Sequence, residues 1–341
     1  MFFSIKHPLS FILLFAVVLK LAAAIFTGGY VFDNEYYNCY HVPASWLAKP
    51  WLVFFIRLIL AAFSLLIITI GYRIVKVIAD KKTALETAVL LAFLWFIPYV
   101  TVHPLPQVVT IPFLLYGTLL IVKQDYLLKN NELEKFHRTT FIIAGFCLGL
   151  GFSIWYQSIL YFLGIVIAMM CLKNWKGVLM TLIGFVVAIC IAETVPDLIR
   201  FGTPFHRMYE FFSNSGVYLF SKGVQPWIYY SLPIVLIGFV PPLSIMIMFG
   251  FIRVWCKYIL LFLPSLLFLL YYMIFPNPDG TYLLPAVPTY IICGFVGWKE
   301  FKRKSEFWTK NKRLLLVFNV LTLLINLALM VYCFIKTFNI I

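Results

Sequence analysis

The chain has 341 residues, of which 63% are apolar and only 12% carry a charge. About a quarter of the residues of a soluble domain are charged, so the composition excludes that class and indicates an integral membrane protein. The formal net charge is +14, but no base-reading motif or soluble basic domain accompanies it, which argues against nucleic acid as a partner. Membrane lipids with anionic headgroups are the partners that this charge fits.

Apolar stretches recur along the chain and predict ten or eleven transmembrane helices, since crossing a bilayer takes roughly 20 helical residues. They are apolar on all sides, whereas strands of a membrane barrel would alternate polar and apolar residues, so we expect an all-α polytopic fold. The expected helices lie near residues 8–27, 51–71, 84–102, 106–122, 139–154, 156–172, 177–195, 229–252, 258–275, 283–298 and 314–337. Lys20 and Arg57 lie within the first two; Lys20 either pairs with an acid or reaches the interface.

The positions of lysine and arginine predict the orientation, because basic loops stay on the cytoplasmic side. With the N-terminus inside, 20 of the 27 basic residues fall in cytoplasmic segments. Two sizeable loops, residues 28–50 and 196–228, then face the extracytoplasmic side. The polar stretch 123–138 is a cytoplasmic connector, so residues 1–341 are expected to form a single membrane-embedded domain.

Motifs that would bind a nucleotide are missing: there is no Gly-rich phosphate loop of the Walker or Rossmann type. The energy for any chemistry must therefore arrive with the substrate, and a lipid-linked activated group would fit. The seven cysteines show neither a disulfide framework nor metal-ligand spacing. No Asn-x-Ser/Thr sequon is present, which favours a bacterial cytoplasmic membrane over the endoplasmic reticulum.

Acidic residues mark the first external loop, in the stretch "YVFDNEYYNCYHVPAS" at residues 30–45. An acid at the end of a transmembrane helix tends to face a water-filled cavity, which makes Asp33 and Glu35 functional candidates. The alternative is a solvated turn or a helix cap. His41 either supports the acid or is an interfacial histidine.

Three stretches in this order resemble motifs of one enzyme family. The first is Phe32-Asp33-Asn34-Glu35-Tyr36-Tyr37. The second runs from Asp197 through Phe201-Gly202-Thr203-Pro204 and Gly223 to Pro226-Trp227-Ile228-Tyr229-Tyr230. The third is Tyr282-Leu283-Leu284-Pro285-Ala286-Val287-Pro288. Over residues 10–300 the chain resembles the GT-C glycosyltransferases, in particular the α-mannosyltransferases of N-glycan and GPI-anchor assembly; 314–337 is an additional C-terminal helix.

The resemblance implies a glycosyltransferase that moves a sugar, mannose by analogy, from a polyprenyl-phosphate donor to a glycan or glycolipid acceptor on the extracytoplasmic side. Where the family carries a cationic stretch, this chain has Asn277-Pro278-Asp279-Gly280-Thr281. Two alternatives stay open. One is a transporter or flippase of a lipid-linked saccharide, and the other is a non-catalytic subunit of a glycan-assembly complex.

Such a reaction needs a base for the acceptor hydroxyl and cations for the departing phosphate. We expect Asp33 to be the base, with Glu35 orienting the acceptor or binding a divalent cation if one is used. The expected phosphate ligands are Arg200, His206 and Arg207, which could instead anchor the protein at the membrane surface, and His103, which could be a plain turn residue. Tyr229 and Tyr282 are expected to line the substrate path, although interfacial anchoring also explains such residues.

Overall fold

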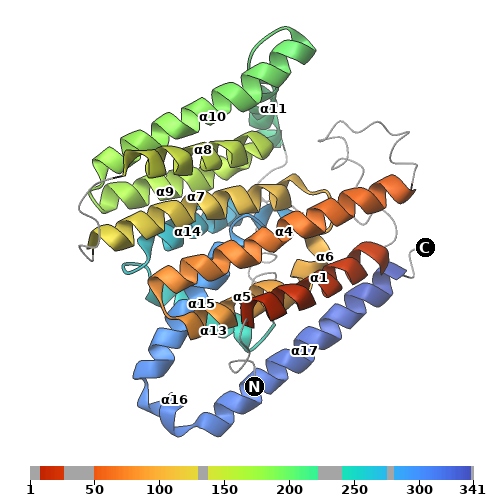
Figure 1. The fold of residues 1–341 in the computed structure, drawn as a ribbon, viewed down its shortest axis with the longest axis vertical. Coiled ribbons are helices and arrows are strands. Elements are labelled where there is room, and N and C mark those ends of the chain that lie inside the picture. Colours follow the sequence, from red (N-terminus) through yellow and green to blue (C-terminus); the bar gives the residue numbers. More distant parts are fainter. Residues whose placement is uncertain (1–7, 27–49, 130–136, 222–239, 275–279, 339–341) are drawn as a thin grey trace. The chain divides into compact units, whose positions relative to one another are not determined.

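The computed structural model describes residues 8–26, 50–129, 137–221, 240–274 and 280–338. All regular secondary structure in these ranges is helical, which confirms the all-α prediction (Figure 1). Helices long and apolar enough to cross a membrane are Pro8–Phe26, Trp51–Ile78, Pro106–Leu128, Trp175–Phe201 and Lys312–Cys333. Shorter apolar helices are Arg138–Ile154, Tyr156–Cys171, Leu243–Arg253 and Ile259–Tyr271. Asp33, Glu35 and Tyr229 lie outside the described residues.

The chain divides into two compact units. Unit 1 comprises Met1–Pro112, Val235–Val254 and Ile291–Ile341, and unit 2 comprises Phe113–Ile234 and Trp255–Tyr290. The helix α7 (Pro106–Lys129) begins in unit 1 and continues into unit 2. The expectation of a single domain over residues 1–341 stays a prediction.

In unit 1, helix α1 packs against α4, α5 and α6, and α17 contacts α1, α6, α13 and α16. The bounds are α1 (Pro8–Phe26), α4 (Pro50–Ile78), α5 (Lys81–Phe93), α6 (Phe96–Val100), α13 (Leu243–Arg253), α15 (Val287–Lys304), α16 (Glu306–Lys310) and α17 (Lys312–Phe338). The first residues of α15, up to Tyr290, belong to unit 2. The core of unit 1 includes the fully buried Ile74, Val75 and Leu91.

The stretch expected to form one helix over residues 84–102 is broken between α5 and α6. Pro98 explains part of the break, because a proline ring clashes with the carbonyl four residues earlier and lacks an N–H of its own. Asn326 of α17 then binds the backbone groups that the break exposes. Its amide nitrogen donates to the carbonyl of Phe93 at 2.7 Å and its oxygen accepts from the N–H of Trp95 at 2.9 Å.

In unit 2, α8 packs against α10, and α9 packs against both α14 and α10; α8, α9 and α10 lie side by side (Figure 1). The bounds are α8 (Arg138–Ile154), η2 (Tyr156–Ser158), α9 (Ile159–Cys171), α10 (Trp175–Phe201), α11 (His206–Ser221), α14 (Ile259–Ile274) and η3 (Gly280–Leu283). The close approach of α8 and α10 requires glycine, since a Cβ atom on Gly145 would lie 1.9 Å from the carbonyl oxygen of Thr181. Small residues allow such contacts between membrane helices.

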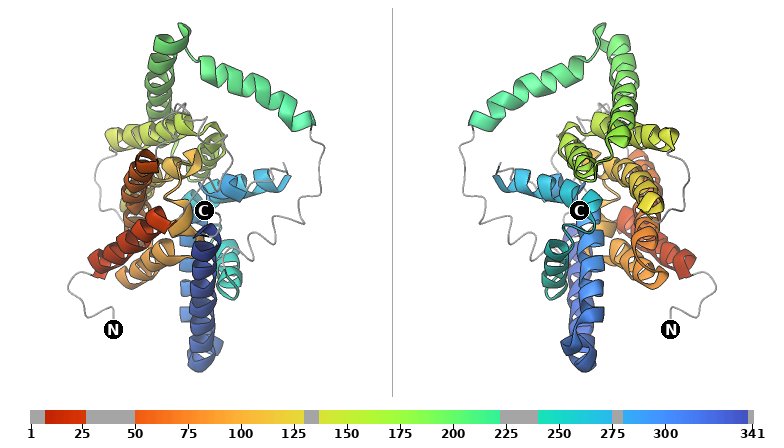
Figure 2. Two further views of the ribbon diagram at one scale, coloured as in Figure 1. Left: turned by 90° about the vertical axis from the view of Figure 1, so that its right-hand side faces the viewer. Right: turned by 90° about the vertical axis from the view of Figure 1, so that its left-hand side faces the viewer.

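The corner between α10 and α11 places polar residues of both helices close together. Helix α10 ends at Phe201 and is capped by Gly202, which has a φ of 72° and so adopts the left-handed conformation that glycine favours at helix ends. Figure 2 shows α11 leaving the end of α10 at a sharp angle. The turn brings the first residues of α11 back towards the last turns of α10.

Candidate functional site

Two carboxylates lie on one face of α10, within an otherwise apolar helix. Glu193 and Asp197 are four residues apart, a spacing that places side chains on the same side of a helix. Both are completely buried. Buried carboxylates need partners, because an ion without water or a counter-charge is strongly destabilised. Their partners come from α11 and η2.

Arg207, in the first turn of α11, is the basic partner of both acids. Its Nε donates to Oδ1 of Asp197 at 2.5 Å, and its backbone N–H donates to Oδ2 of the same carboxylate at 3.1 Å. One of its terminal nitrogens, Nη2, lies 3.5 Å from Oε2 of Glu193. Burial lowers the pKa of Arg207, but the hydrogen bond to Asp197 and the charge of Glu193 raise it by more than burial lowers it. The net shift of the pKa is therefore upward. The guanidinium is therefore a fixed cation.

Aromatic residues of η2 and its neighbours complete this cluster. The hydroxyl of Tyr156 donates to Oε2 of Glu193 at 2.8 Å, and the ring of Tyr156 lies 4.9 Å from that of Phe211. The preceding residue, Trp155, packs against Tyr282 of η3 with 5.1 Å between ring centroids. The indole Nε1 of Trp155 is buried and has no hydrogen-bond partner among the described residues. The corner therefore combines two carboxylates, a guanidinium and a phenol, and Trp155, next to Tyr156 in the chain, has an N–H that is still able to donate.

The two other predicted phosphate ligands of unit 2 lie at the same corner. Arg200 is exposed, and its guanidinium lies 5.4 Å from the ring centroid of Phe201. His206 is half-buried and stacks on the same ring at 4.5 Å, with Nδ1 3.4 Å from the hydroxyl of Thr203. The loop "FGTPF" thus brings Arg200, His206 and Arg207 to one corner, as their proximity in the sequence predicts.

His103 lies in unit 1, between α6 and α7. It is buried, and its ring centroid is 4.9 Å from that of Tyr99. Burial, and then the nearby charge of Arg57, lower the pKa of His103 to about 3. The imidazole is therefore neutral at physiological pH. It can donate or accept a hydrogen bond with a ligand, but it supplies no positive charge.

Lys20 of α1 is a second buried basic residue of unit 1. Its ammonium donates to the hydroxyl of Ser64 on α4 at 2.7 Å and to the hydroxyl of Thr101 after α6. Lys20 is buried, so it does not reach the interface, and its partners among the described residues are not acids. Instead, Lys20 joins three segments of unit 1 through neutral hydroxyls.

Comparison with protein families identifies the enzyme class. A model of the Alg9-like mannosyltransferase family matches residues 4–341, nearly the whole chain. The chain belongs to the Alg9-like mannosyltransferase family. It is thus a membrane glycosyltransferase of the mannosyltransferase type, which confirms the resemblance seen in the sequence. Neither the search of curated proteins nor that of solved structures gives a match.

For this mannosyltransferase, sequence reasoning did not find Glu193, Trp155 or Tyr156 as site residues. A signal for Glu193 was present, since it is an acid inside the apolar stretch 177–195 and lies four residues before Asp197. No comparable signal marked Tyr156, because tyrosine near a helix end usually indicates the membrane interface. Its role becomes visible only through its contact with Glu193, 37 positions later in the chain.

Proposed function

We propose that this enzyme transfers mannose from a polyprenyl-phosphate donor to a glycan or glycolipid acceptor at the extracytoplasmic face, in a bacterial cytoplasmic membrane. Membership of the Alg9-like mannosyltransferase family supports the sugar and the reaction class. A lipid-linked donor suits an enzyme whose helices are embedded in the membrane, because the donor reaches it through the bilayer. The phosphate of such a donor is also the leaving group.

The observation that carries this proposal is the position of Arg207 at the corner of α10 and α11, where Asp197 accepts two hydrogen bonds from it. Asp197 holds both the backbone and the Nε of Arg207, so the guanidinium has a fixed position, and a third of its side chain is exposed. Arginine binds phosphate through a planar pair of N–H groups, and the first turn of a helix also favours anions. Arg200 and His206 add a cation and a hydrogen-bonding ring at the same corner.

The basic residues that flank α10 support the proposed side of the membrane. Lys173 and Lys176 lie at the start of this helix, and basic residues favour the cytoplasmic side. The far end of α10, with Asp197 and Arg207, is then extracytoplasmic. Cysteines placed at Ser45 and Ser221 should accordingly react with an impermeant reagent added to intact cells.

Aromatic side chains near η2 are suited to the sugar. Trp155 and Tyr282 offer ring faces beside an indole N–H that has no partner among the described residues. Binding sites for polar ligands often combine such apolar surfaces with a few directed polar groups. We therefore assign Trp155 and Tyr282 to the sugar, with Tyr229 as a further lining residue.

The proposed chemistry is a single displacement at the anomeric carbon. Asp33 accepts the proton of the acceptor hydroxyl, whose oxygen forms the new bond to the sugar. The bond between the anomeric carbon and the phosphate oxygen breaks, and the phosphate departs with the electron pair towards Arg207 and Arg200. Glu35 orients the acceptor or binds a divalent cation. The position of Asp33 and Glu35 in the sequence, soon after α1, supports these roles.

The test is a transfer assay in proteoliposomes. The purified protein receives labelled polyprenyl-phosphate mannose and a lipid extract from cells that lack the chain, in which the acceptor accumulates. We expect label to move to an acceptor lipid in the wild-type protein, with a strong reduction for Arg207→Ala. Use of a nucleotide sugar as the donor would contradict the proposal, as would movement of the donor across the bilayer without transfer.

A further inference from the structure

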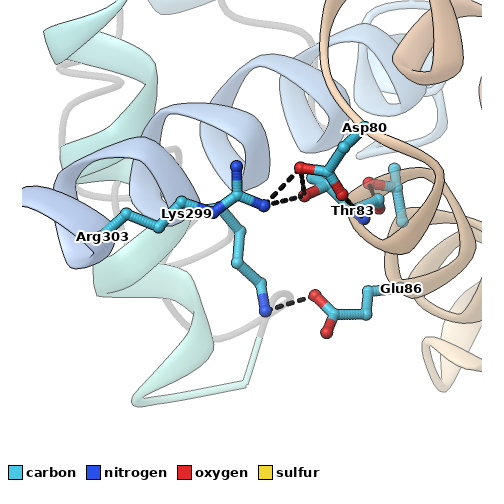
Figure 3. A network of polar contacts seen from close by, with 6 residues as sticks. Asp80, Thr83, Glu86, Lys299 and Arg303 are labelled. Carbon is cyan, nitrogen blue, oxygen red and sulfur yellow. Dashed lines mark hydrogen bonds and ion pairs between the residues drawn. The ribbon is translucent and has the colours of Figure 1, made fainter. Parts of the chain in front are cut away.

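A cluster of cations lies at one end of unit 1, where α15 passes α5 (Figure 3). Lys299 forms an ion pair with Glu86, and Arg303 forms one with Asp80 while also donating to the hydroxyl of Thr83 at 3.2 Å. Two of the cations of α15 are therefore neutralised by acids at the start of α5. Because basic residues favour the cytoplasmic side, this end of unit 1 is assigned to the cytoplasmic leaflet.

Lys302 belongs to the same cluster but has no counter-charge of its own. It is half-buried and forms neither a hydrogen bond nor an ion pair with the described residues. Burial, and then the charge of Lys299, lower the pKa of Lys302; Lys82 and Arg303 act in the same direction, and Glu86 opposes them. The cations thus outnumber the acids around Lys302, and an anion placed there would be attracted.

A cavity of about 330 Å³ opens beside these cations, lined by residues of α5, α13, α15 and α17. Its volume is within the range typical of ligand pockets, roughly 300–1,000 Å³. Lys299 and Lys302 lie in its wall, and most of the remaining wall is apolar, with Phe93, Met246 and Leu323 as examples. A ligand that fits must therefore combine a negative group with a long apolar part.

Polar residues of α17 also line this cavity, and one of them is unused. Asn326 is occupied by the backbone of Phe93 and Trp95, and the hydroxyl of Thr322 donates to the carbonyl of Phe318. The amide of Asn319 makes no hydrogen bond with the described residues. It can therefore bind an ester or phosphate oxygen of a ligand.

We propose that this cavity binds an anionic phospholipid of the cytoplasmic leaflet, with its phosphate at Lys302, its glycerol esters near Asn319 and an acyl chain along the apolar wall. Basic pockets between transmembrane helices are suited to acidic lipid headgroups. A free phosphate would leave the apolar wall without a partner. Leu323 and the neighbouring Leu324 of α17 are exposed apolar residues that can continue the contact with acyl chains. This site is independent of the proposed sugar transfer.

The experiment measures lipid binding to the purified full-length protein by native mass spectrometry and by thermal stability in detergent. The probes are phosphatidylglycerol and phosphatidylcholine with identical acyl chains. We expect phosphatidylglycerol to bind as one retained lipid for each chain and to raise the melting temperature more than phosphatidylcholine does. Lys302→Gln should weaken the binding of phosphatidylglycerol about tenfold, since it removes a charge-assisted contact.

Two further variants separate the cavity from general electrostatic attraction. Lys304→Gln removes an exposed charge from the same end of α15, does not line the cavity and should leave the affinity unchanged. Leu323→Trp fills the apolar part and should reduce retention of the lipid while Lys302 is intact. The melting temperatures of Lys302→Gln and Lys304→Gln are first measured without lipid, and they should be equal. A folding defect in either variant would appear as a lower value.

Several results would overturn the proposal. Equal binding of the two phospholipids would remove the role of charge, and equal losses in the two lysine variants would show attraction without a defined site. If inorganic phosphate raised the melting temperature as much as phosphatidylglycerol does, Lys302 would be assigned to a free anion. If the chain formed a dimer and Leu323→Trp abolished it, the cavity would be assigned to a second copy of the chain.

Discussion

The carboxylate of Asp197 binds Arg207 at two points, through the backbone N–H and through the Nε of the side chain. This arrangement fixes the start of α11 relative to the end of α10 and fixes the guanidinium at the same time. It also leaves the terminal nitrogens of Arg207 as the part of the group that can reach a ligand. One of them, Nη2, already lies near Glu193.

Arg207→Ala should weaken donor binding or turnover about tenfold to a hundredfold, because a charge-assisted contact of roughly 1.5–3 kcal/mol is lost. Arg207→Lys should recover only part of this loss, since it keeps the charge but not the planar N–H pair that also binds Asp197. Donor binding to detergent-purified protein measures both. Arg200→Ala should have the smaller effect, because Arg200 is exposed and does not share the hydrogen bonds that Asp197 accepts from Arg207. Unchanged donor binding in Arg207→Ala would leave Arg207 as a purely structural residue.

Tyr156→Phe should destabilise unit 2 by roughly 1.5–3 kcal/mol, the range for a hydrogen bond to a charged group. The variant removes only the hydroxyl that donates to Glu193 and keeps the ring contact with Phe211. Chemical unfolding followed by circular dichroism would measure the change. Tyr209→Phe removes a hydroxyl from a side chain that is 75% exposed, and it should have almost no effect. Equal stability of the two variants would show that Glu193 does not depend on Tyr156.

Gly184→Leu should separate α8 from α10 and reduce both thermal stability and activity. A Cβ atom at this position would lie 2.0 Å from the carbonyl oxygen of Ile142, so the helices must move apart. Overpacking of this kind costs about 1–3 kcal/mol or more, and here it would also displace the helix that carries Glu193 and Asp197. Ile183→Leu, at the adjacent and exposed position, is the matched control. A melting temperature equal to that of the control would contradict the close packing of α8 and α10.

The stabilising effect of the Asp80 charge should disappear in acid. Burial raises the pKa of this carboxyl, but the backbone N–H of Thr83 and the guanidinium of Arg303 lower it more, to about 2. Because the folded-state pKa lies below the ordinary value of 3.8, the stabilisation is complete above about pH 4 and is lost as the pH falls towards 2. Asp80→Asn keeps a side chain able to cap α5. The difference in melting temperature between this variant and the wild type should therefore shrink as the pH falls from about 4 to 2, and a constant difference would argue against the ion pair.

The sequence predicted the helical fold well because apolar runs of sufficient length have few other stable structures in a membrane. It did not predict the break between α5 and α6. The backbone groups at this break are bound by Asn326, which lies more than 200 residues later in the chain. At the site, the grouping of Arg200, His206 and Arg207 was predictable because they are close in the chain. The contacts of Glu193 with Tyr156 and of Lys20 with Ser64 were not, since they depend on how separate helices pack.

The most direct test of the proposed sugar transfer is the turnover of Asp33→Asn with labelled polyprenyl-phosphate mannose in proteoliposomes. The substitution keeps the shape of the side chain but removes the proposed proton acceptor, so turnover should fall by about 10²–10⁴ while donor affinity changes little. Glu35→Gln serves as the comparison, and both variants must insert and elute as the wild type does. A smaller loss in Glu35→Gln would support Asp33 as the base. Transfer by Asp33→Asn at the wild-type rate would contradict it.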